Sequence, residues 1–306
     1  MTPIAINFGG YQQPASVHTQ AAALFGEILG EKIGGRIRFE LIGDVLQLGR
    51  KSGDLLPMVE RGELSCCYIS TVRFTHAVPE FRLLELPFAV KDRSSINAAL
   101  DGELGEFLKR RVRATMPVRV LGFWDNGFRH LTNSVRPLRT PADCRGIRIR
   151  TQMSELHAEV FRTLGFEPLP ADVKEFVEEI ATGKFQAQDN PLTNIYNFGV
   201  HKYHRYITLS GHFFGASALA CNEAQYQSWP PDVRAAVEAA ALAATALQRR
   251  LAAAEDASVL EKLDPRDNEV IRLTAAEHRA FVDAVRPVTA RYRNELSPQL
   301  LAWLDR

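Results

Sequence analysis

One stretch limits the possible folds more than any other, a helix-favouring run that begins after Trp229. It reads WPPDVRAAVEAAALAATALQRRLAAAEDASVLEKLDP, and neither glycine nor proline interrupts it between Pro231 and Pro265. Pro231 and Asp232 are favourable in the first turn of a helix, and Pro265 ends the pattern. At about 1.5 Å per residue the helix would span about 45 Å or more. Because that length exceeds one small domain, we expect the helix to lie across two.

Strand and helix patterns alternate along the rest of the chain, in two successive series. Runs at 4–8, 36–42 and 118–124 are typical of strands, and residues 18–33 and 94–114 have the apolar spacing of helices. The pattern restarts after residue 125 with the strand-like GIRIR and continues to about residue 212. This alternation predicts an α/β fold with largely parallel sheets, and a length of 306 residues suits two domains.

Charge and hydropathy exclude two classes of partner. The formal net charge is +1, so no overall field attracts nucleic acid or an acidic membrane. No apolar run approaches the roughly 20 residues of a membrane span, so we expect no direct membrane insertion. The opening residues MTPIAINFGG lack a basic segment followed by an apolar one and do not form a signal peptide. Two locations stay open: the cytoplasm, or a compartment reached by a mature form whose signal has been removed.

Signatures of catalysis are absent from the sequence. It has no G-x-S-x-G, no phosphate loop ending in G-K-[ST], no G-x-G-x-x-G and no H-E-x-x-H. The adjacent Cys66 and Cys67 lack the C-x-x-C spacing of redox pairs. A Cys144–Cys221 disulfide and four buried free thiols both fit the spacing of the cysteines. We expect no enzyme, no cofactor and no bound metal.

Polar groups gather where three predicted strands end. Arg150 ends the GIRIR strand, Asn190 ends FQAQDN, and Arg129 follows VRVLGFW. Ligands of open α/β sheets bind beyond the carboxyl ends of strands. A guanidinium group matches a carboxylate bidentately, and an asparagine amide can donate to the same group. A carboxylate clamp is one interpretation, and arginines paired on the surface are the other; spacing alone leaves both open.

These motifs together resemble the DctP-like solute-binding proteins of TRAP transporters, the tripartite ATP-independent uptake systems for organic acids. The family pattern reads G-x-R-x-x-T-N, T-P-x-D-x-x-G-x-K-[IL]-R, a glycine and a proline, E-x-x-x-A-x-x-x-G and Q-E-N-P. This chain has GFRHLTNS, TPADCRGIRIR, LGFEPLP, EFVEEIATG and QDNP, in that order and at similar spacing. Each motif alone is weak evidence for the resemblance, but five motifs in the same order and at similar spacing are strong evidence. LELPF, LSGH and the long helix extend the resemblance over nearly the whole chain.

The resemblance implies a two-lobed α/β fold of the periplasmic-binding-protein type (type II), with the long helix spanning both lobes. Residues 1–125 and 213–254 would form lobe I, and residues 126–212 and 255–306 lobe II, with the ligand cleft between them. The chain would be an extracytoplasmic, periplasmic receptor for a small organic acid. It would act as a monomer, without a cofactor, and deliver its ligand to the membrane permease subunits of a TRAP transporter.

The resemblance also assigns roles to single residues. Arg150 corresponds to the arginine that pairs with the ligand carboxylate, Arg129 to a second arginine, and Asn190 to the asparagine that supports the carboxylate. Where the family usually has V-D-G-Q-E-N-P, this chain has FQAQDNP, with Ala187 for glycine and Asp189 for glutamate. The substitutions leave the asparagine in its place.

Five further residues are candidate ligand contacts. Ser70 stands where some members that bind large sugar acids have a glutamate, which argues against a sugar acid. Tyr11, Trp124 and Phe213 can line the pocket and favour a compact or aromatic acid, with ordinary core packing as the alternative. His212 can contact the ligand or cap a strand.

Two other functions remain open at this point. An enzyme on the same scaffold would need a nucleophile or an acid–base pair in the cleft, and Cys66, Cys67 and His212 are its candidates. A two-lobed sensor would instead use its lobes to signal through a partner protein.

Overall fold

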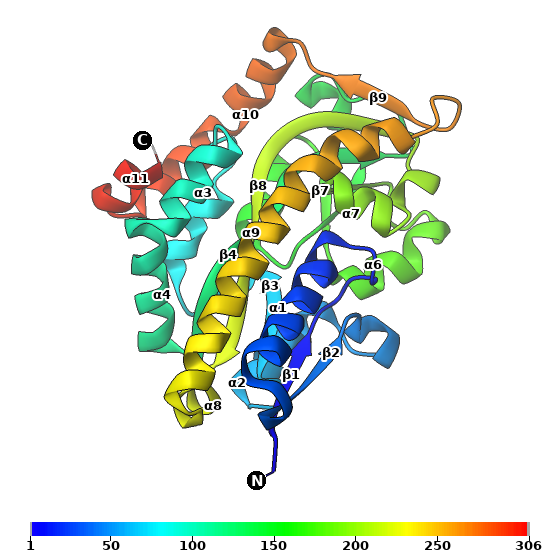
Figure 1. Cartoon of the computed structure of the whole chain (residues 1–306). Helices are drawn as coiled ribbons and strands as arrows, with labels where there is room; N and C mark the ends of the chain where they lie inside the picture. Colours follow the sequence, from blue (N-terminus) through cyan, green and yellow to red (C-terminus); the bar gives the residue numbers. More distant parts are fainter. Residues whose placement is uncertain (1, 305–306) are drawn as a thin grey trace. The chain divides into compact units, whose positions relative to one another are not determined.

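A computed structural model describes residues 2–304 (Figure 1). The chain divides into two compact units. Unit 1 comprises the chain up to Phe81, together with Asn97–Asp125 and Ala216–Ala253; unit 2 comprises Arg82–Ile96, Asn126–Gly215 and the chain from Ala254 onward. Both units contain strands and helices, which confirms the predicted α/β class. A ligand cleft between the predicted lobes stays a prediction.

The sheet of unit 1 has the strand order β2-β1-β3-β8. β1 pairs in parallel with β2 and β3, and β3 pairs antiparallel with the end of β8. The strands are β1 (Ile4–Gly9), β2 (Ile37–Ile42) and β3 (Cys66–Ser70). The helices are α1 (Val17–Ile33), α2 (Leu55–Glu60), α4 (Glu103–Thr115) and α8 (Glu223–Ser228).

The sheet of unit 2 has the order β4-β7-β5-β6, and β9 lies along the start of β8. β7 pairs antiparallel with β4 and in parallel with β5. The strands are β5 (Arg148–Thr151), β6 (Glu167–Pro170), β7 (Ala187–Pro191) and β9 (Glu269–Arg272). The helices are α5 (Glu155–Thr163), α6 (Val173–Glu179), α7 (Leu192–Asn197), α10 (Ala275–Asn294) and α11 (Pro298–Leu304).

Two of the β-strands and two of the α-helices have residues in both units. They are β4 (Val118–Asn133), β8 (Tyr206–Asn222), α3 (Arg93–Asp101) and α9 (Pro231–Lys262). The long helix predicted from the sequence is confirmed as α9, which has 32 residues and runs from yellow to orange in Figure 1.

Two predicted elements have different bounds in the structure. The single helix expected at 94–114 is two helices, because Gly102 between them has a non-helical backbone with φ −102° and ψ −145°. The strand expected at 118–124 continues to Asn133, because residues 129–133 pair with β7. Arg129 therefore lies within a strand, and the prediction that it follows a strand end is wrong.

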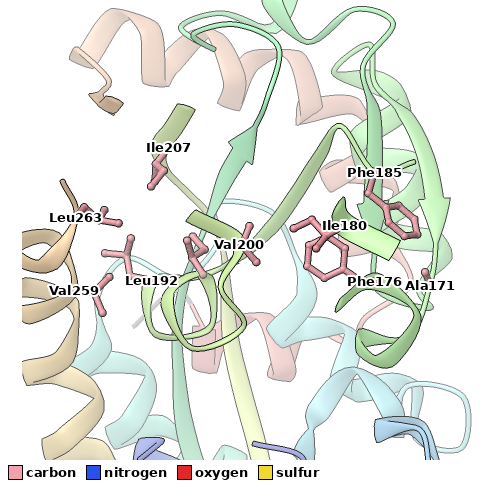
Figure 2. Close-up of a cluster of buried hydrophobic side chains, with 10 residues drawn as sticks. Ala171, Phe176, Ile180, Phe185, Leu192, Val200, Ile207, Val259 and Leu263 are labelled. Atoms are coloured by element: carbon pink, nitrogen blue, oxygen red, sulfur yellow. The ribbon is translucent and has the colours of Figure 1, made fainter. Parts of the chain in front are cut away.

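A cluster of apolar side chains forms the core of unit 2 beside the end of β5. The rings of Phe176 and Phe185 lie 5.6 Å apart between centroids, and both side chains are fully buried. Figure 2 shows Val259 of α9 next to Leu192 of α7 in the same cluster. Burial of each such large side chain stabilises the fold by about 1.5–3 kcal/mol. The core thus fixes Phe176, over which an arginine side chain lies.

Candidate functional site

Arg150 lies near the end of β5 and is 4% exposed. Its Nε donates to the carbonyl of Ala171 over 3.0 Å, and its guanidinium carbon lies 5.5 Å from the ring centroid of Phe176. Asp172 caps α6 directly after Ala171 by accepting a hydrogen bond from the backbone N–H of Lys174. The cap holds the turn that presents the carbonyl. The buried cation is therefore fixed at the carboxyl end of a parallel strand, where its sequence pattern predicted it.

Asn190 belongs to a chain of polar side chains on the face of the sheet that carries Arg150. Gln188 of β7 is in register with Arg150 of β5 and with Thr132 of β4. Asn190 Nδ2 donates to Gln188 Oε1, and Gln188 Nε2 donates to Thr132 Oγ1 over 2.7 Å. Because alternate residues of a strand face the same side, Gln188 and Asn190 share the face of Arg150.

The chain of polar side chains ends at His204, whose contacts fix its tautomer. Burial lowers the pKa of His204 to about 4, so the ring is neutral at pH 7. Nε2 lies 3.1 Å from the carbonyl of Phe185, which can only accept a hydrogen bond, so Nε2 carries the proton. Nδ1, 2.9 Å from Thr132 Oγ1, then accepts from the hydroxyl group. The bonds hold Thr132, and through it Gln188, in one orientation.

Arg129 lies on the opposite face of β4 and β7 from Asn190, because it alternates with His130, which is opposite Asn190. Its Nε donates to Asp189 Oδ2 over 2.5 Å, and its Nη2 donates to the backbone carbonyl of Asp189. Arg129 is 2% exposed and Asp189 is fully buried. Burial alone would raise the pKa of Asp189, but the charge of Arg129 and the contacts with His212 hold it well below its ordinary value. The two residues form a buried ion pair.

His212 contacts the same carboxylate. Its Nε2 lies 3.4 Å from Asp189 Oδ2, and its Nδ1 lies 2.7 Å from Ser210 Oγ. Burial lowers the pKa of His212, although the neighbouring Asp189 opposes the shift. His212 is therefore held within the protein, beside the pair that Arg129 and Asp189 make.

The register thus separates the predicted carboxylate clamp into two groups. Arg150 and Asn190 lie on one face of the sheet, and Arg129 and His212 meet at Asp189 on the other. The ligand contacts of these residues stay predictions.

Phe213 packs in parallel with the ring of His157, with 4.1 Å between centroids and 14° between planes. His157 Nε2 lies 2.9 Å from Glu85 Oε2, and all three side chains are buried. Sequence reasoning missed the His157–Glu85 pair, because the two residues are 72 positions apart and belong to no motif. The only sequence feature that drew attention to this region was the LELPF segment, which contains Glu85 and is part of the family resemblance.

In unit 1, Tyr11 and Trp124 pack against Tyr68 with ring centroids 5.3 and 5.5 Å away. Trp124 Nε1 donates to Thr245 Oγ1 of α9 over 3.1 Å. The backbone N–H of Tyr11 donates to the Tyr68 hydroxyl, also over 3.1 Å. Ser70 ends β3 and is only partly exposed. Tyr68, which the sequence analysis did not single out, is the centre of this aromatic cluster.

His18 is a second residue of the aromatic cluster that the sequence analysis missed. It lies in the first turn of α1, is fully buried, and stacks on Tyr68 with 5.1 Å between ring centroids and 29° between planes. The ring centroid of Trp124 lies 6.0 Å from that of His18. Burial lowers the pKa of His18 to about 3, so the ring is neutral at pH 7. Neither ring nitrogen has a hydrogen-bond partner among the residues that the structure describes.

The four cysteines are buried free thiols. Cys66 lies directly opposite Cys221 in the pairing of β3 with β8. Burial raises the pKa of Cys67 and of Cys144, so neither thiol ionises readily at pH 7. A deprotonated nucleophile, as an enzyme would need at Cys67, is disfavoured.

Residues 2–304 contain neither a metal-binding cluster nor a membrane-spanning helix. No cluster of three or more histidine, cysteine, aspartate or glutamate side chains there could hold a metal ion. No helix in the same range is both long and apolar enough to cross a membrane.

The sequence pattern of the DctP family, described as bacterial extracellular solute-binding protein, family 7, matches residues 8–295. The chain belongs to the DctP family. Membership confirms the resemblance seen in the motifs and the predicted function, that of a solute receptor for organic acids in TRAP transport. Proteins of the DctP family are extracytoplasmic binding proteins.

Curated relatives and solved structures agree with membership of the DctP family. The chain is 28% identical to the 2,3-diketo-L-gulonate-binding periplasmic protein of Escherichia coli, over 90% of this chain and 83% of that protein. It is 26% identical to the C4-dicarboxylate-binding periplasmic protein of Rhodobacter capsulatus, over 98% of this chain and 90% of that protein. The crystal structure of a sugar acid binding protein from Advenella mimigardefordensis with galactonate has the same fold, with a TM-score of 0.94, 23% identity, and coverage of 100% of this chain and 98% of that one.

Proposed function

We propose that this DctP-family receptor binds a small organic acid by its carboxylate at Arg150, with Asn190 supporting the same group. The observation that carries the proposal is the setting of Arg150. It is a buried arginine at the carboxyl end of a parallel strand, fixed by Ala171 and Phe176, on the face of the sheet that carries Asn190. A rigid guanidinium in a desolvated setting loses little entropy when a carboxylate binds it bidentately.

Arg129 takes a more indirect part in this proposal. Two of its nitrogens already donate to Asp189, so the pair is arranged before any ligand arrives. The resemblance makes Arg129 the second arginine of the site. Because Arg129 lies on the other face of the sheet from Arg150, we propose that it acts through Asp189, its partner in β7 next to Asn190, with His212 beside the pair. The remaining predicted contacts, Tyr11, Ser70, Trp124 and Phe213, would meet the rest of the ligand.

The proposed mechanism is binding and release. The ligand would lie between the two lobes and favour their closed state through its higher affinity for that state. The receptor would then deliver the acid to the membrane subunits of a TRAP transporter from the periplasm, as a monomer. Relatives with names that specify a sugar-derived acid and a C4-dicarboxylate support an organic acid as the ligand.

We also propose that the chain catalyses no reaction. Members of its family are binding proteins. Burial raises the pKa of Cys67 and lowers that of His212, and His212 lies against Asp189. These settings favour neither a thiolate nucleophile nor a free general base.

The test is a binding measurement on receptor that has been unfolded and refolded to remove carried-over ligand. Small dicarboxylates, 2-oxo and 2-hydroxy acids, sugar acids and aromatic acids would be screened by thermal shift, and hits measured by calorimetry. A ligand at about 100 times its dissociation constant stabilises the fold by about 2.7 kcal/mol. Arg150→Ala should abolish the shift, because a carboxylate would lose its charge-assisted bonds.

Arg148→Ala is the matched control. Arg148 lies on the same strand and the same face, two residues earlier, and donates to the carbonyls of Lys184 and Gly183. The Arg148→Ala receptor should bind the acid with wild-type affinity. An Arg150→Ala receptor that binds the acid as tightly as the wild type would refute the proposed site, and recovery of a chemically altered ligand would refute the absence of catalysis.

A further inference from the structure

We propose that Cys66 and Cys221 form a disulfide bond when the receptor folds in the periplasm. Both residues belong to unit 1, Cys66 to β3 and Cys221 to the end of β8. Disulfides form and persist in oxidising compartments, so the bond rests on the periplasmic location in the proposed function. It involves no residue of the proposed acid site.

The register of the sheet places the two cysteines directly opposite each other. In an antiparallel pair, opposite residues either exchange backbone hydrogen bonds or lie between such bonds, and in the second arrangement their side chains are closer. The backbone N–H of Asn222 donates to the carbonyl of Ser65 over 2.9 Å. Because this bond joins the residues that flank the pair, Cys66 and Cys221 have the second arrangement. Cα atoms in such pairs lie about 4.5 Å apart, and a disulfide bridges Cα atoms about 4.4–6.8 Å apart.

The two thiols also contact each other. Cys221 Sγ donates to the carbonyl of Asn222 over 3.6 Å. A hydrogen bond with the Cys66 side chain is the largest cause of the raised pKa of Cys221, followed by burial. The sulfur atoms are therefore neighbours already in the thiol form. A bond between them requires no change in the pairing of β3 with β8.

The geometry favours neither of the other two cysteines as the partner of Cys221. Cys67 alternates with Cys66 along β3 and so faces the other side of the sheet, with Ala220 opposite it. Cys144 belongs to unit 2, where its thiol donates to the carbonyl of Thr140 over 3.8 Å. The Cys144–Cys221 disulfide that the sequence left open is thus not the one that the sheet prepares.

Formation of the bond removes one hydrogen from each thiol, which amounts to two protons and two electrons. A disulfide-containing oxidant accepts both and leaves as two thiols. One cysteine thiolate attacks the oxidant to give a mixed disulfide, and the thiolate of the other cysteine then displaces the remaining thiol of the oxidant. Both cysteines are fully buried in the folded chain. The exchange would therefore take place while β3 and β8 assemble, and burial would afterwards protect the bond from reductants.

The bond would join two distant sections of unit 1. Cys66 lies in the section that ends at Phe81, and Cys221 in the section Ala216–Ala253. The two cysteines are more than 150 residues apart in the sequence. A cross-link over so long a loop removes much conformational entropy from the unfolded chain. We therefore expect the disulfide to stabilise the receptor and to prevent β8 from separating from β3.

The first experiment identifies the bond by mass spectrometry of the full chain exported to a bacterial periplasm. The protein is denatured in iodoacetamide without reduction and digested with trypsin. Two of the four thiols should be alkylated. The peptides 62–73 and 206–234, which contain Cys66 and Cys221, should be linked and lighter than their sum by two hydrogen atoms. Four alkylated thiols, or a link to Cys144 instead, would overturn the proposal.

Cys67→Ser is the matched control, because Cys67 is the neighbour of Cys66 on the same strand and lies in the same tryptic peptide. The Cys67→Ser receptor should keep the linked peptides, and the Cys66→Ser and Cys221→Ser receptors should lose them. Loss of the link in Cys67→Ser would show that the wrong cysteine had been assigned. The result for the wild type decides whether a link exists even where a variant does not fold.

The second experiment measures the effect of the bond on stability. Wild-type protein is denatured, reduced and refolded with either oxidised or reduced glutathione. The oxidised form should melt at least about 5 °C above the reduced form. Cys67→Ser should keep this difference, and Cys66→Ser should melt at one temperature under both conditions. Equal melting temperatures for the linked and the reduced wild type would overturn the stabilising role.

Acid binding by the same preparations separates the disulfide from the proposed function. A linked receptor that binds none of the screened acids would refute the proposed function and leave the disulfide in place. An exported receptor with four free thiols, whose acid binding is lost on Arg150→Ala, would refute the disulfide and leave the proposed function in place.

Discussion

Asp189 accepts two hydrogen bonds from Arg129, one at its carboxylate and one at its backbone carbonyl. One residue of β7 thus holds the arginine side chain of β4 through two nitrogens of its guanidinium group, Nε and Nη2. Because both residues are buried, the charge on each depends on the other.

Loss of the Asp189 charge should destabilise the protein strongly. Asp189→Asn leaves the Arg129 cation buried without its counter-charge, and breaking a buried pair in this way costs about 3–5 kcal/mol. Urea denaturation followed by circular dichroism measures the change. Asp264→Asn, which removes an exposed partner of Arg266, serves as the control and should leave stability unchanged. A small effect at Asp189 would mean that water reaches the Arg129 side chain.

Stability should fall as the solution is acidified from pH 6.5 towards pH 4.5. Burial lowers the pKa of His18 to about 3 and that of His204 to about 4, both from 6.5. Between those values the unfolded chain binds protons that the folded chain does not, so the free energy of unfolding rises with pH. Each histidine contributes a slope of up to about 1.4 kcal/mol per pH unit.

His18→Phe should reduce this slope by the share of one histidine. Urea denaturation at several pH values measures the slope for both proteins. A free energy of unfolding that stays constant from pH 6.5 to 4.5 would contradict the burial of these neutral rings.

Gly10→Ala should destabilise unit 1 and weaken ligand binding. The added methyl group would lie 2.5 Å from Tyr68 Cε1 and 2.8 Å from the Gly43 carbonyl, so the ring must move. Overpacking of this kind costs about 1–3 kcal/mol. Gly30→Ala is the matched control, since Gly30 lies inside α1 and a methyl group there would meet nothing within 4 Å. The Gly30→Ala substitution should raise the free energy of unfolding by about 0.5–1 kcal/mol. Melting temperatures that move in the same direction for both variants would contradict the tight packing at Gly10.

The native protein should resist thiol reagents. All four cysteines are buried, and burial raises the pKa of Cys67 and Cys144. The reagent DTNB should therefore react slowly with folded protein and with four thiols per chain after denaturation of reduced protein. Rapid reaction of one thiol in the native state would reopen the possibility of a reactive cysteine.

Local pattern was sufficient to predict the surroundings of Arg150 but not those of Arg129. The alternation in GIRIR and its position before a turn are local features, and they place Arg150 at a strand end. The extension of β4 through WDNGFRHLTN depends on pairing with β7, about sixty residues away, which no local pattern contains. The polar composition of this extension is typical of a loop. The local sequence does not reveal that its polar residues have buried partners, such as Asp189 for Arg129.

His18 shows a second limit of sequence reasoning. It occurs in a helical pattern with Ala22 and Phe25, and a histidine on the apolar face of a helix is typical of a core position. What distinguishes it is the absence of a hydrogen-bond partner among the described residues. That feature depends on the rings of Tyr68 and Trp124, which come from distant strands.

The passage of β4, β8 and α9 through both units has a consequence for how the protein is made. β3 pairs with the end of β8, more than 140 residues further along the chain, so the first unit is incomplete until that strand has been synthesised. A gene fragment that ends at residue 125 would lack this strand and the start of α9. Neither unit can then be obtained by a single cut in the gene, and we expect such fragments to be degraded rather than to fold as independent modules.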